Sequence, residues 1–184
     1  MGDCEDVPWR RAISEKQLGM DNERRKVEEG VEMAESSIMT DQIRKAKGKE
    51  FGPFVYEVEK GAIKRIAEAV GDPNPLWQDE EHGRRSRYGT IVASPTFLFT
   101  LRFDEVTKHI EELECPLKDV LNGGSEIEYF EPIMPGDVIT VRAKLADVQE
   151  RVGKRTMLIF AIDLTYENQK GALLAKHRFN FIRY

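Results

Sequence analysis

The stretch GDPNPLW, residues 71–77, combines a carboxylate, a carboxamide and two prolines within seven residues. Each proline holds its own φ at about −65° and restricts the residue before it, so Asp72 and Asn74 are predicted to lie in a stiff turn. A carboxylate held in this way can activate a water molecule or take up a proton. Such residues also commonly make Asx turns after a helix, so the stretch alone leaves a structural and a chemical interpretation open.

Other catalytic patterns are missing from the sequence. There is no glycine-rich phosphate loop after a predicted strand and no HExxH or CxxC motif, and His82, His109 and His177 are scattered. We therefore expect no metal site. Ser94 and Ser125 do not lie in a GxSxG context, which argues against hydrolysis through an acyl-enzyme.

The elements on either side of the turn have clear hydrophobic periods. FGPFVYEVE, from Phe51, alternates like a strand, and KGAIKRIAEAV places Ile63, Ile66, Ala67 and Val70 on one helical stripe that ends at Gly71. A charged segment, DEEHGRRSRYG, follows the turn. SPTFLFTLRF then predicts an apolar helix with Ser94 as the N-cap and Pro95 at the first helical position.

After residue 120 the pattern is that of strands. Apolar residues alternate with polar ones in three runs, which contain Ile139, Val141, Ala143 and Leu145; Leu158, Phe160, Ile162, Leu164 and Tyr166; and Ala175, Phe179 and Phe181. The connections PIMPGD and ENQKG carry residues typical of antiparallel turns. One strand, then helices, then about four strands indicate an α+β domain with an antiparallel sheet wrapped around an apolar helix.

Length and composition favour one domain with an appendage. The chain has 184 residues, of which 40% are hydrophobic, and most of its net charge of −5 lies in residues 1–37, which hold ten acidic and six basic side chains. Residues 1–37 are therefore predicted to be a polar N-terminal extension of a domain spanning 38–184. Val27, Val31 and Ala34 recur at a helical spacing that could dock, and TDQIRKAK predicts a short helix with Thr40 as N-cap.

The same features limit the partners and the compartment. The acidic balance argues against a nucleic-acid partner, and no apolar run approaches the ~20 residues that cross a bilayer. There is no apolar signal region, and Cys4 and Cys115 are isolated. We expect a cytoplasmic protein without disulfides or membrane contact.

Several of these segments together resemble a known family. GDPNPL, YGTIVASPTF and LNGGSEIEYFEPIMPGDVITVRAKL are similar to the MaoC-type dehydratases of the hot-dog superfamily, in the N-terminal or FAS1-like dehydratase branch, over residues 38–184. The resemblance implies a hot-dog fold, a dimer with paired sheets, and hydration or dehydration of acyl thioesters in fatty acid metabolism. The substrate would be carried on coenzyme A or acyl carrier protein, with no separate cofactor.

The resemblance also implies a catalytic pair, which this chain does not complete. In active members an Asp and a His five residues later handle the water and the α-proton. Asp72 matches the Asp and Asn74 the motif Asn, but Trp77 stands at the position of the His. Imidazole delivers and removes protons near neutral pH, whereas indole does not. His82 is the nearest replacement, yet its charged surroundings favour a solvated surface residue.

Substrate-binding candidates follow from the same resemblance and from residue chemistry. Trp77 and the Phe97, Leu98 and Phe99 run are candidate linings of an acyl tunnel, although ordinary core packing explains the run equally well. Backbone N–H groups near Ala93 and Ser94 would bind the thioester oxygen. A further candidate set is a cationic cluster that could hold phosphates, formed by Arg84, Arg85 and Arg87. The alternative is that these arginines belong to a salt-bridged exposed helix.

Two classes of function therefore remain. In the first, the chain is the half of a heterodimeric dehydratase, a hydro-lyase, that lacks the catalytic His and shapes the acyl-binding tunnel, while a His-bearing MaoC-like subunit completes the site. In the second, it is a homodimeric acyl-thioester-binding protein or regulator without chemistry, or one whose chemistry uses Asp72 alone. In both, we expect at least a dimer, because a single hot-dog domain leaves a sheet edge uncovered.

Overall fold

The computed structural model describes residues 37–101, 103–112 and 120–184, and residues 37–184 form one compact unit. Residues 1–36 of the predicted N-terminal extension, the docking helix with Val27, Val31 and Ala34, and both cysteines lie outside the described residues. Ser37 is joined to the domain, because its hydroxyl donates to Oε2 of Glu150 at 2.9 Å. The elements are α2 (Asp41–Lys45), β1 (Glu50–Glu57), α3 (Lys60–Ala69), α4 (Pro75–Gln78), α5 (Glu80–Arg85), the 3₁₀ helix η1 (Pro95–Thr100), α6 (Phe103–Glu111), β2 (Val120–Tyr129), β3 (Val138–Arg151), β4 (Met157–Glu167) and β5 (Leu173–Arg183).

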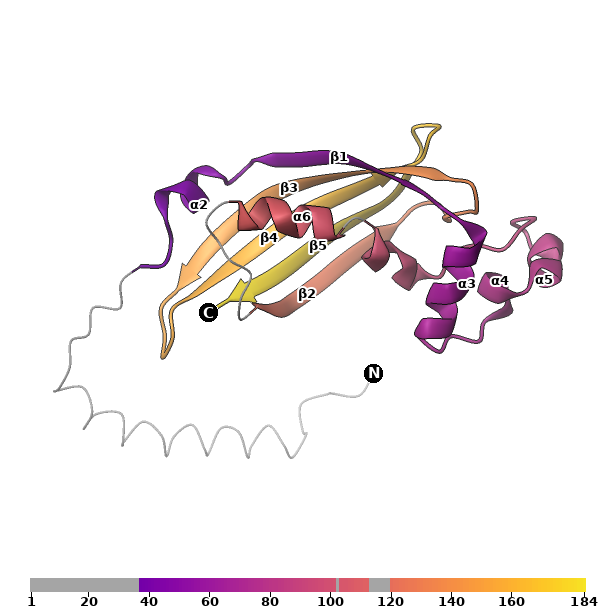
Figure 1. Cartoon of the computed structure of the whole chain (residues 1–184), viewed down its shortest axis with the longest axis horizontal. Helices are drawn as coiled ribbons and strands as arrows, with labels where there is room; N and C mark the ends of the chain where they lie inside the picture. The colour runs from indigo at the N-terminus through magenta and orange to yellow at the C-terminus, as the bar shows by residue number, and fades with distance from the viewer. Residues whose placement is uncertain (1–36, 102, 113–119) are drawn as a thin grey trace, which may run out of the picture. The chain divides into compact units, whose positions relative to one another are not determined.

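One antiparallel sheet forms the body of the unit, with the strand order β1-β3-β4-β5-β2. The helical segments η1 and α6 lie against one face of it, and α3, α4 and α5 gather beyond one end of the strands (Figure 1). This arrangement of a sheet against helical segments is the one that the resemblance to the hot-dog superfamily implied, and the predicted α+β fold class is confirmed.

The predicted alternation of apolar and polar residues along the strands identifies the side chains that form the core. In β4 every second residue is buried, namely Leu158, Phe160, Ile162, Leu164 and Tyr166. The rings of Phe160 and Phe181 stack at 4.5 Å between β4 and β5. Because side chains alternate between the faces of a strand, the same period leaves the polar residues on the opposite face of the sheet.

The apolar helix predicted from Ser94 is interrupted, which corrects the prediction of one continuous helix. Residues 95–100 form the 3₁₀ helix η1, and an α-helix begins only at Phe103. The Thr100 hydroxyl donates to the carbonyl of Phe97 at 2.7 Å, and Leu101 has an extended backbone. A hydroxyl that bonds a nearby carbonyl competes with helical hydrogen bonds, so the first segment ends there.

Two helix predictions are confirmed at their ends, and one residue is corrected. Thr40 caps α2, since its side-chain oxygen accepts from the amide of Ile43 at 3.1 Å. Helix α3 ends at Ala69, and Gly71 takes the glycine position after the C-cap residue, as expected. Val70, placed on the buried stripe of α3, is instead 55% exposed, because it is the C-cap residue and lies past the last turn that packs on the core.

His177 is a core residue, on the strand face that also carries the buried Ala175 and Phe179. It is 4% exposed, its Nδ1 lies 3.4 Å from the hydroxyl of Tyr166, and its Nε2 has no partner among the described residues. Burial lowers the pKa of His177 below its ordinary value. The folded state therefore favours the neutral ring.

This pKa shift predicts an acid-sensitive stability. Below about pH 6.5 the unfolded chain binds a proton that the folded His177 resists, so the free energy of unfolding should fall as the pH decreases, by at most about 1.4 kcal/mol per pH unit. Urea titrations at several pH values should show this slope, and His177→Phe should remove it. The exposed His82, changed to Phe, is the matched control. An unchanged slope in His177→Phe would contradict the prediction.

Among the described residues, strand β2 is an edge strand that pairs with β5 alone. All but one of its residues are exposed. Large apolar side chains are exposed on and around it, namely Phe99, Val120, Leu121, Tyr129 and Phe130. An edge of this length with apolar side chains is suited to pairing with another chain.

Candidate functional site

The end of α3 fixes the position of Asp72. Gly71, with φ of 69°, lets the chain reverse, and its amide donates to the carbonyl of Glu68 at 3.0 Å. The amide of Asp72 donates to the carbonyl of Ala67 at 2.9 Å. These two bonds make a Schellman motif, which holds the first residues after the helix in one conformation.

The Asp72 carboxylate is bonded within its own turn. Oδ1 accepts from the amide of Asn74 at 3.1 Å, and Oδ2 accepts from the indole Nε1 of Trp77 at 2.8 Å. The carbonyl oxygen of Asp72 accepts from Nε2 of Gln78 at 2.7 Å. Asp72 thus makes the Asx turn of the structural interpretation and also holds the residue at the motif's His position, while the chemical interpretation stays a prediction.

Asn74 begins the next helix. Its Oδ1 accepts from the amide of Leu76 at 3.0 Å, and Pro75 takes the first helical position of α4. This is the ordinary work of an N-cap. Asn74, predicted as part of the catalytic motif, therefore acts here on the backbone that carries Trp77.

A cavity of about 280 Å³ lies next to this turn. Trp77 is part of its wall, and Arg87 and Glu131 are its charged residues. The remaining lining is mostly apolar or aromatic: Tyr88, Val92, Ala93, Ser94, Pro95, Tyr129, Phe130, Pro132 and Ile133. An apolar cavity with a few polar groups is typical of a small-molecule site.

The predicted oxyanion donors differ in their availability. The amide of Ala93 donates to the carbonyl of Ile133 at 2.9 Å, so it is already used and the prediction for Ala93 as a donor is not supported. The bond arises because the segment before η1 packs against the chain that follows β2. Ser94 is buried and lines the cavity, and its hydroxyl lies 2.9 Å from the hydroxyl of Thr96.

The three arginines of the cationic cluster have different surroundings. Arg85 forms an ion pair with Glu81 one helical turn earlier, and Arg84 is exposed on α5. Only Arg87 lines the cavity, where its guanidinium contacts the hydroxyl and the ring of Tyr88. The interpretation as an exposed, salt-bridged helix therefore fits Arg84 and Arg85, and Arg87 remains the candidate for a phosphate.

Helix α5 is fastened to α3 by an acidic residue. Glu80 bonds the ammonium groups of Lys60 and Lys64, each at 2.9 Å. These two hydrogen bonds and charges lower the pKa of Glu80 to about 2. Asp79 caps α5 by accepting from the amides of Glu81 and His82.

Two residues of the apolar run, Phe97 and Leu98, belong to the core, and none of the run's three residues lines the cavity. Phe97 is fully buried, its ring meets Tyr56 edge to face at 6.2 Å, and Leu98 is also buried. Phe99 is 47% exposed and packs against His177. The substrate-binding prediction for Phe97 is therefore not supported, because the 3₁₀ geometry of η1 turns its side chain into the sheet.

No histidine among the described residues hydrogen-bonds Asp72. His82 is exposed on α5, as expected. His109 stacks on Phe51 at 5.5 Å, and its Nδ1 lies 3.0 Å from Oε2 of Glu112. His177 is buried in the sheet. Within the described residues no group of three or more His, Cys, Asp or Glu could hold a metal ion, and no helix is long and apolar enough to cross a membrane.

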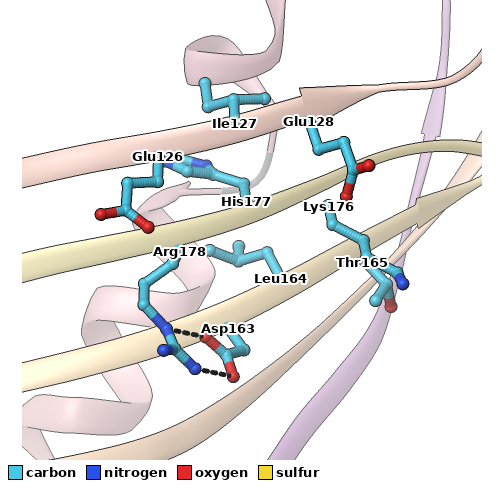
Figure 2. Close-up of a pocket in the computed structure, with 9 residues that line it drawn as sticks. All are labelled: Glu126, Ile127, Glu128, Asp163, Leu164, Thr165, Lys176, His177 and Arg178. Atoms are coloured by element: carbon cyan, nitrogen blue, oxygen red, sulfur yellow. Dashed lines mark hydrogen bonds and ion pairs between the residues drawn. The ribbon is translucent and has the colours of Figure 1, made fainter.

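A larger cavity, of about 440 Å³, lies on the outer face of the sheet over β4, β5 and β2 (Figure 2). Arg178 meets Asp163 there through two hydrogen bonds of 2.7 Å, which raise the pKa of Arg178. The other charged residues of this cavity are Glu126, Glu128 and Lys176. Opposite charges on neighbouring strands stabilise a sheet, and this cavity is lined mainly by polar and charged side chains. The cavity beside Trp77 is the better candidate site.

Sequence reasoning missed part of that site. Tyr88, Tyr129, Phe130 and Ile133 line the cavity but were not singled out. The available signal was the segment EYFEPI, which contains the last two residues of β2 and the four that follow, and joins aromatic residues to a proline. It contributed to the family resemblance without indicating that these side chains face Trp77.

Comparison with known proteins places the chain in context. A family model described as "FAS1-like, dehydratase domain region" matches residues 45–177. A UPF0336 protein of Thermobifida fusca is 31% identical over 109 residues, which are 58% of this chain and 72% of that protein. A probable enoyl-CoA hydratase alpha subunit of Thermomonospora curvata is 30% identical over 140 residues, 66% of this chain but 43% of that protein.

The fold has solved counterparts. The truncated HadBC complex of Mycobacterium tuberculosis, a 3R-hydroxyacyl-ACP dehydratase, matches with a TM-score of 0.62 at 19% identity. The match covers 74% of this chain and 96% of the other. At this identity the likeness concerns the fold.

Proposed function

Since the chain belongs to the MaoC-like dehydratase family, in its FAS1-like dehydratase branch, we propose that it is the subunit of an acyl-thioester dehydratase or enoyl hydratase that lacks the catalytic His. One observation carries the proposal. The residue that stands at the position of that His, Trp77, points its indole N–H at Oδ2 of Asp72.

Chemistry at the thioester explains why this matters. Hydration of an enoyl thioester adds a hydroxyl at the β-carbon and a proton at the α-carbon, and the reverse reaction removes both. A carboxylate and an imidazole can divide these proton transfers near neutral pH, whereas an indole N–H keeps its proton. The chain therefore contributes the acyl-binding wall, and a second subunit contributes the acid and base.

The cavity supplies groups for the rest of the substrate. Its apolar lining suits the acyl group, and the buried Ser94 lies where its backbone N–H could bind the thioester oxygen. Arg87 is placed to contact a phosphate of coenzyme A or acyl carrier protein. The substrate brings its own carrier, and no further cofactor is required.

A His-bearing subunit is the proposed partner. The exposed edge strand β2 and the apolar residues around it offer a surface for pairing. The HadBC neighbour is, by its title, a complex. Pairing of this kind would place the partner's acid and base beside the apolar cavity of this chain.

The test is to produce the chain alone and together with a MaoC-like protein that has an intact Asp and His. We expect light scattering to show an assembly of at least two chains. We expect hydration of crotonyl-CoA, measured as the loss of enoyl absorbance, only when both proteins are present. A partner variant with its motif His changed to Ala is the control and should assemble without activity. A stable monomer at micromolar concentration, or strong activity of the unmixed chain, would contradict the proposal.

A homodimeric acyl-thioester-binding protein is the second candidate. It is favoured by one observation, that both carboxylate oxygens of Asp72 are already bonded within the turn. Calorimetric binding of crotonyl-CoA by a pure homodimer, without any gain of activity on adding a His-bearing partner, would support this candidate over the first.

A further inference from the structure

The hydrogen bonds of Asp72 suggest a role other than that of an unused acid or base. A residue that activates water keeps an oxygen directed at the substrate. Here Oδ1 is directed at the amide of Asn74 and Oδ2 at the indole of Trp77. The carboxylate therefore serves its own turn.

The same bonds orient one wall of the cavity. Trp77 is partly buried against the core and lines the cavity, so one side of its ring faces protein and another faces the open space. An indole has one polar atom, and at 2.8 Å from a carboxylate oxygen that atom makes a charge-assisted hydrogen bond. The bond selects one rotamer among those that the side chain could adopt.

The backbone under Trp77 is held as well. Asn74 caps α4, and Gln78 closes the turn by donating to the carbonyl of Asp72 at 2.7 Å. The amide of Val92, in the cavity wall, donates to the carbonyl of Leu76 at 3.0 Å. Trp77 thus stands on a short helix that is fastened on both sides.

The orientation of the Trp77 indole matters because the cavity is small. About 280 Å³ is at or below the lower end of ordinary ligand sites, which begin at about 300 Å³. Indole is larger than the imidazole that the family motif places at this position. Protein interiors are closely packed, so the surrounding side chains cannot easily move aside to make room for it. A fixed indole therefore shortens the space available to an acyl group.

We propose that Asp72 is a positioning residue that fixes the indole of Trp77 as a wall of this cavity, so that the cavity accepts compact acyl groups and excludes long ones. The assignment of an acyl group rests on the proposed function. The relation between Asp72 and Trp77 does not, and it is tested separately.

The first experiment measures the indole N–H directly. The chain has two tryptophans, Trp9 and Trp77, so a Trp9→Phe background leaves one indole signal in a ¹⁵N NMR spectrum of the full chain. The signal should be shielded from hydrogen exchange, and Asp72→Asn should speed its exchange by about 10- to 100-fold, as expected for loss of a hydrogen bond to a charged group. The carboxamide has one acceptor oxygen and cannot serve both donors.

Asp41→Asn is the matched control, because it removes the same charge from an exposed residue of α2. It should leave the exchange rate unchanged. An indole N–H that is unprotected in the parent, or equally protected in Asp72→Asn, would overturn the positioning role. If Asp72→Asn does not fold, Asp72→Ser replaces it with the same expected result.

The second experiment measures acyl selection in the complex with a His-bearing partner. Crotonyl-, octenoyl- and dodecenoyl-CoA are compared for the parent, Trp77→Phe and Asp72→Asn. Both variants should lower KM for the longer thioesters by about tenfold or more relative to KM for crotonyl-CoA, and this ratio of KM values within each variant is the readout. Unchanged selection would overturn the role of the wall. If no thioester is bound by any form, the proposed function fails while the NMR result still decides the role of Asp72.

Discussion

Trp77→His is expected to raise the rate at which this chain hydrates an enoyl thioester by about 10²- to 10⁴-fold, the usual contribution of a general acid or base. The substitution places an imidazole on α4, five residues after Asp72, where the indole now donates to Oδ2. The bonds that hold the turn do not involve the indole, namely those of Gly71, Asn74 and Gln78. The backbone should therefore keep its geometry while Asp72 gains a partner that titrates near neutral pH.

The measurement is loss of enoyl absorbance with crotonyl-CoA, using the purified chain without a partner. Trp77→Phe is the matched control, since it also removes the indole but supplies no proton donor, and it should remain inactive. Adding Asp72→Asn to Trp77→His should abolish the gain. Replacing a large side chain can leave a cavity that costs a few kcal/mol, so circular dichroism must first establish that each variant is folded. A folded Trp77→His chain without activity would contradict the proposed dyad geometry.

Gly83→Ala is expected to destabilise the domain strongly. Gly83 is buried in α5, and a Cβ atom at this position would lie 2.5 Å from the amide nitrogen of Ile91 and 2.7 Å from the carbonyl carbon of Thr90. These are backbone atoms, which cannot rotate away as a side chain would. Overpacking of this kind costs about 1–3 kcal/mol and sometimes more. The segment that must move leads directly to Ala93 and Ser94, so thioester binding should weaken as well.

Gly61→Ala is the matched control for this prediction. Gly61 lies exposed in α3, and the nearest atom to its added Cβ would be the flexible guanidinium of Arg65. A helical Gly→Ala change without a clash usually stabilises by about 0.5–1 kcal/mol. Urea denaturation should therefore move the two variants in opposite directions. Equal stability of Gly83→Ala and the parent would show that α5 does not pack on residues 90–91 as described.

The sequence by itself determined the elements and much of the local geometry of the candidate site. The period of two in β4 and β5 identified their buried faces, because side chains alternate along any strand. Gly71 marked the end of α3, and Thr40 marked the start of α2, because caps are short-range hydrogen bonds whose donors and acceptors are adjacent in the chain. The stiff turn at Asp72 was also predictable, because each proline restricts its own backbone and that of the residue before it.

Only the tertiary structure decided which side chains meet. Trp77 and Tyr129 share a cavity although they are far apart in the sequence, and of the three arginines only Arg87 joins them. The amide of Ala93 is used by Ile133, and Phe97 faces the core. These outcomes depend on strand order and on the break between η1 and α6, which arise from packing between distant segments. Local propensity and spacing carry no information about such contacts, so the motif can place Trp77 opposite Asp72 but cannot name the distant side chains that complete the cavity.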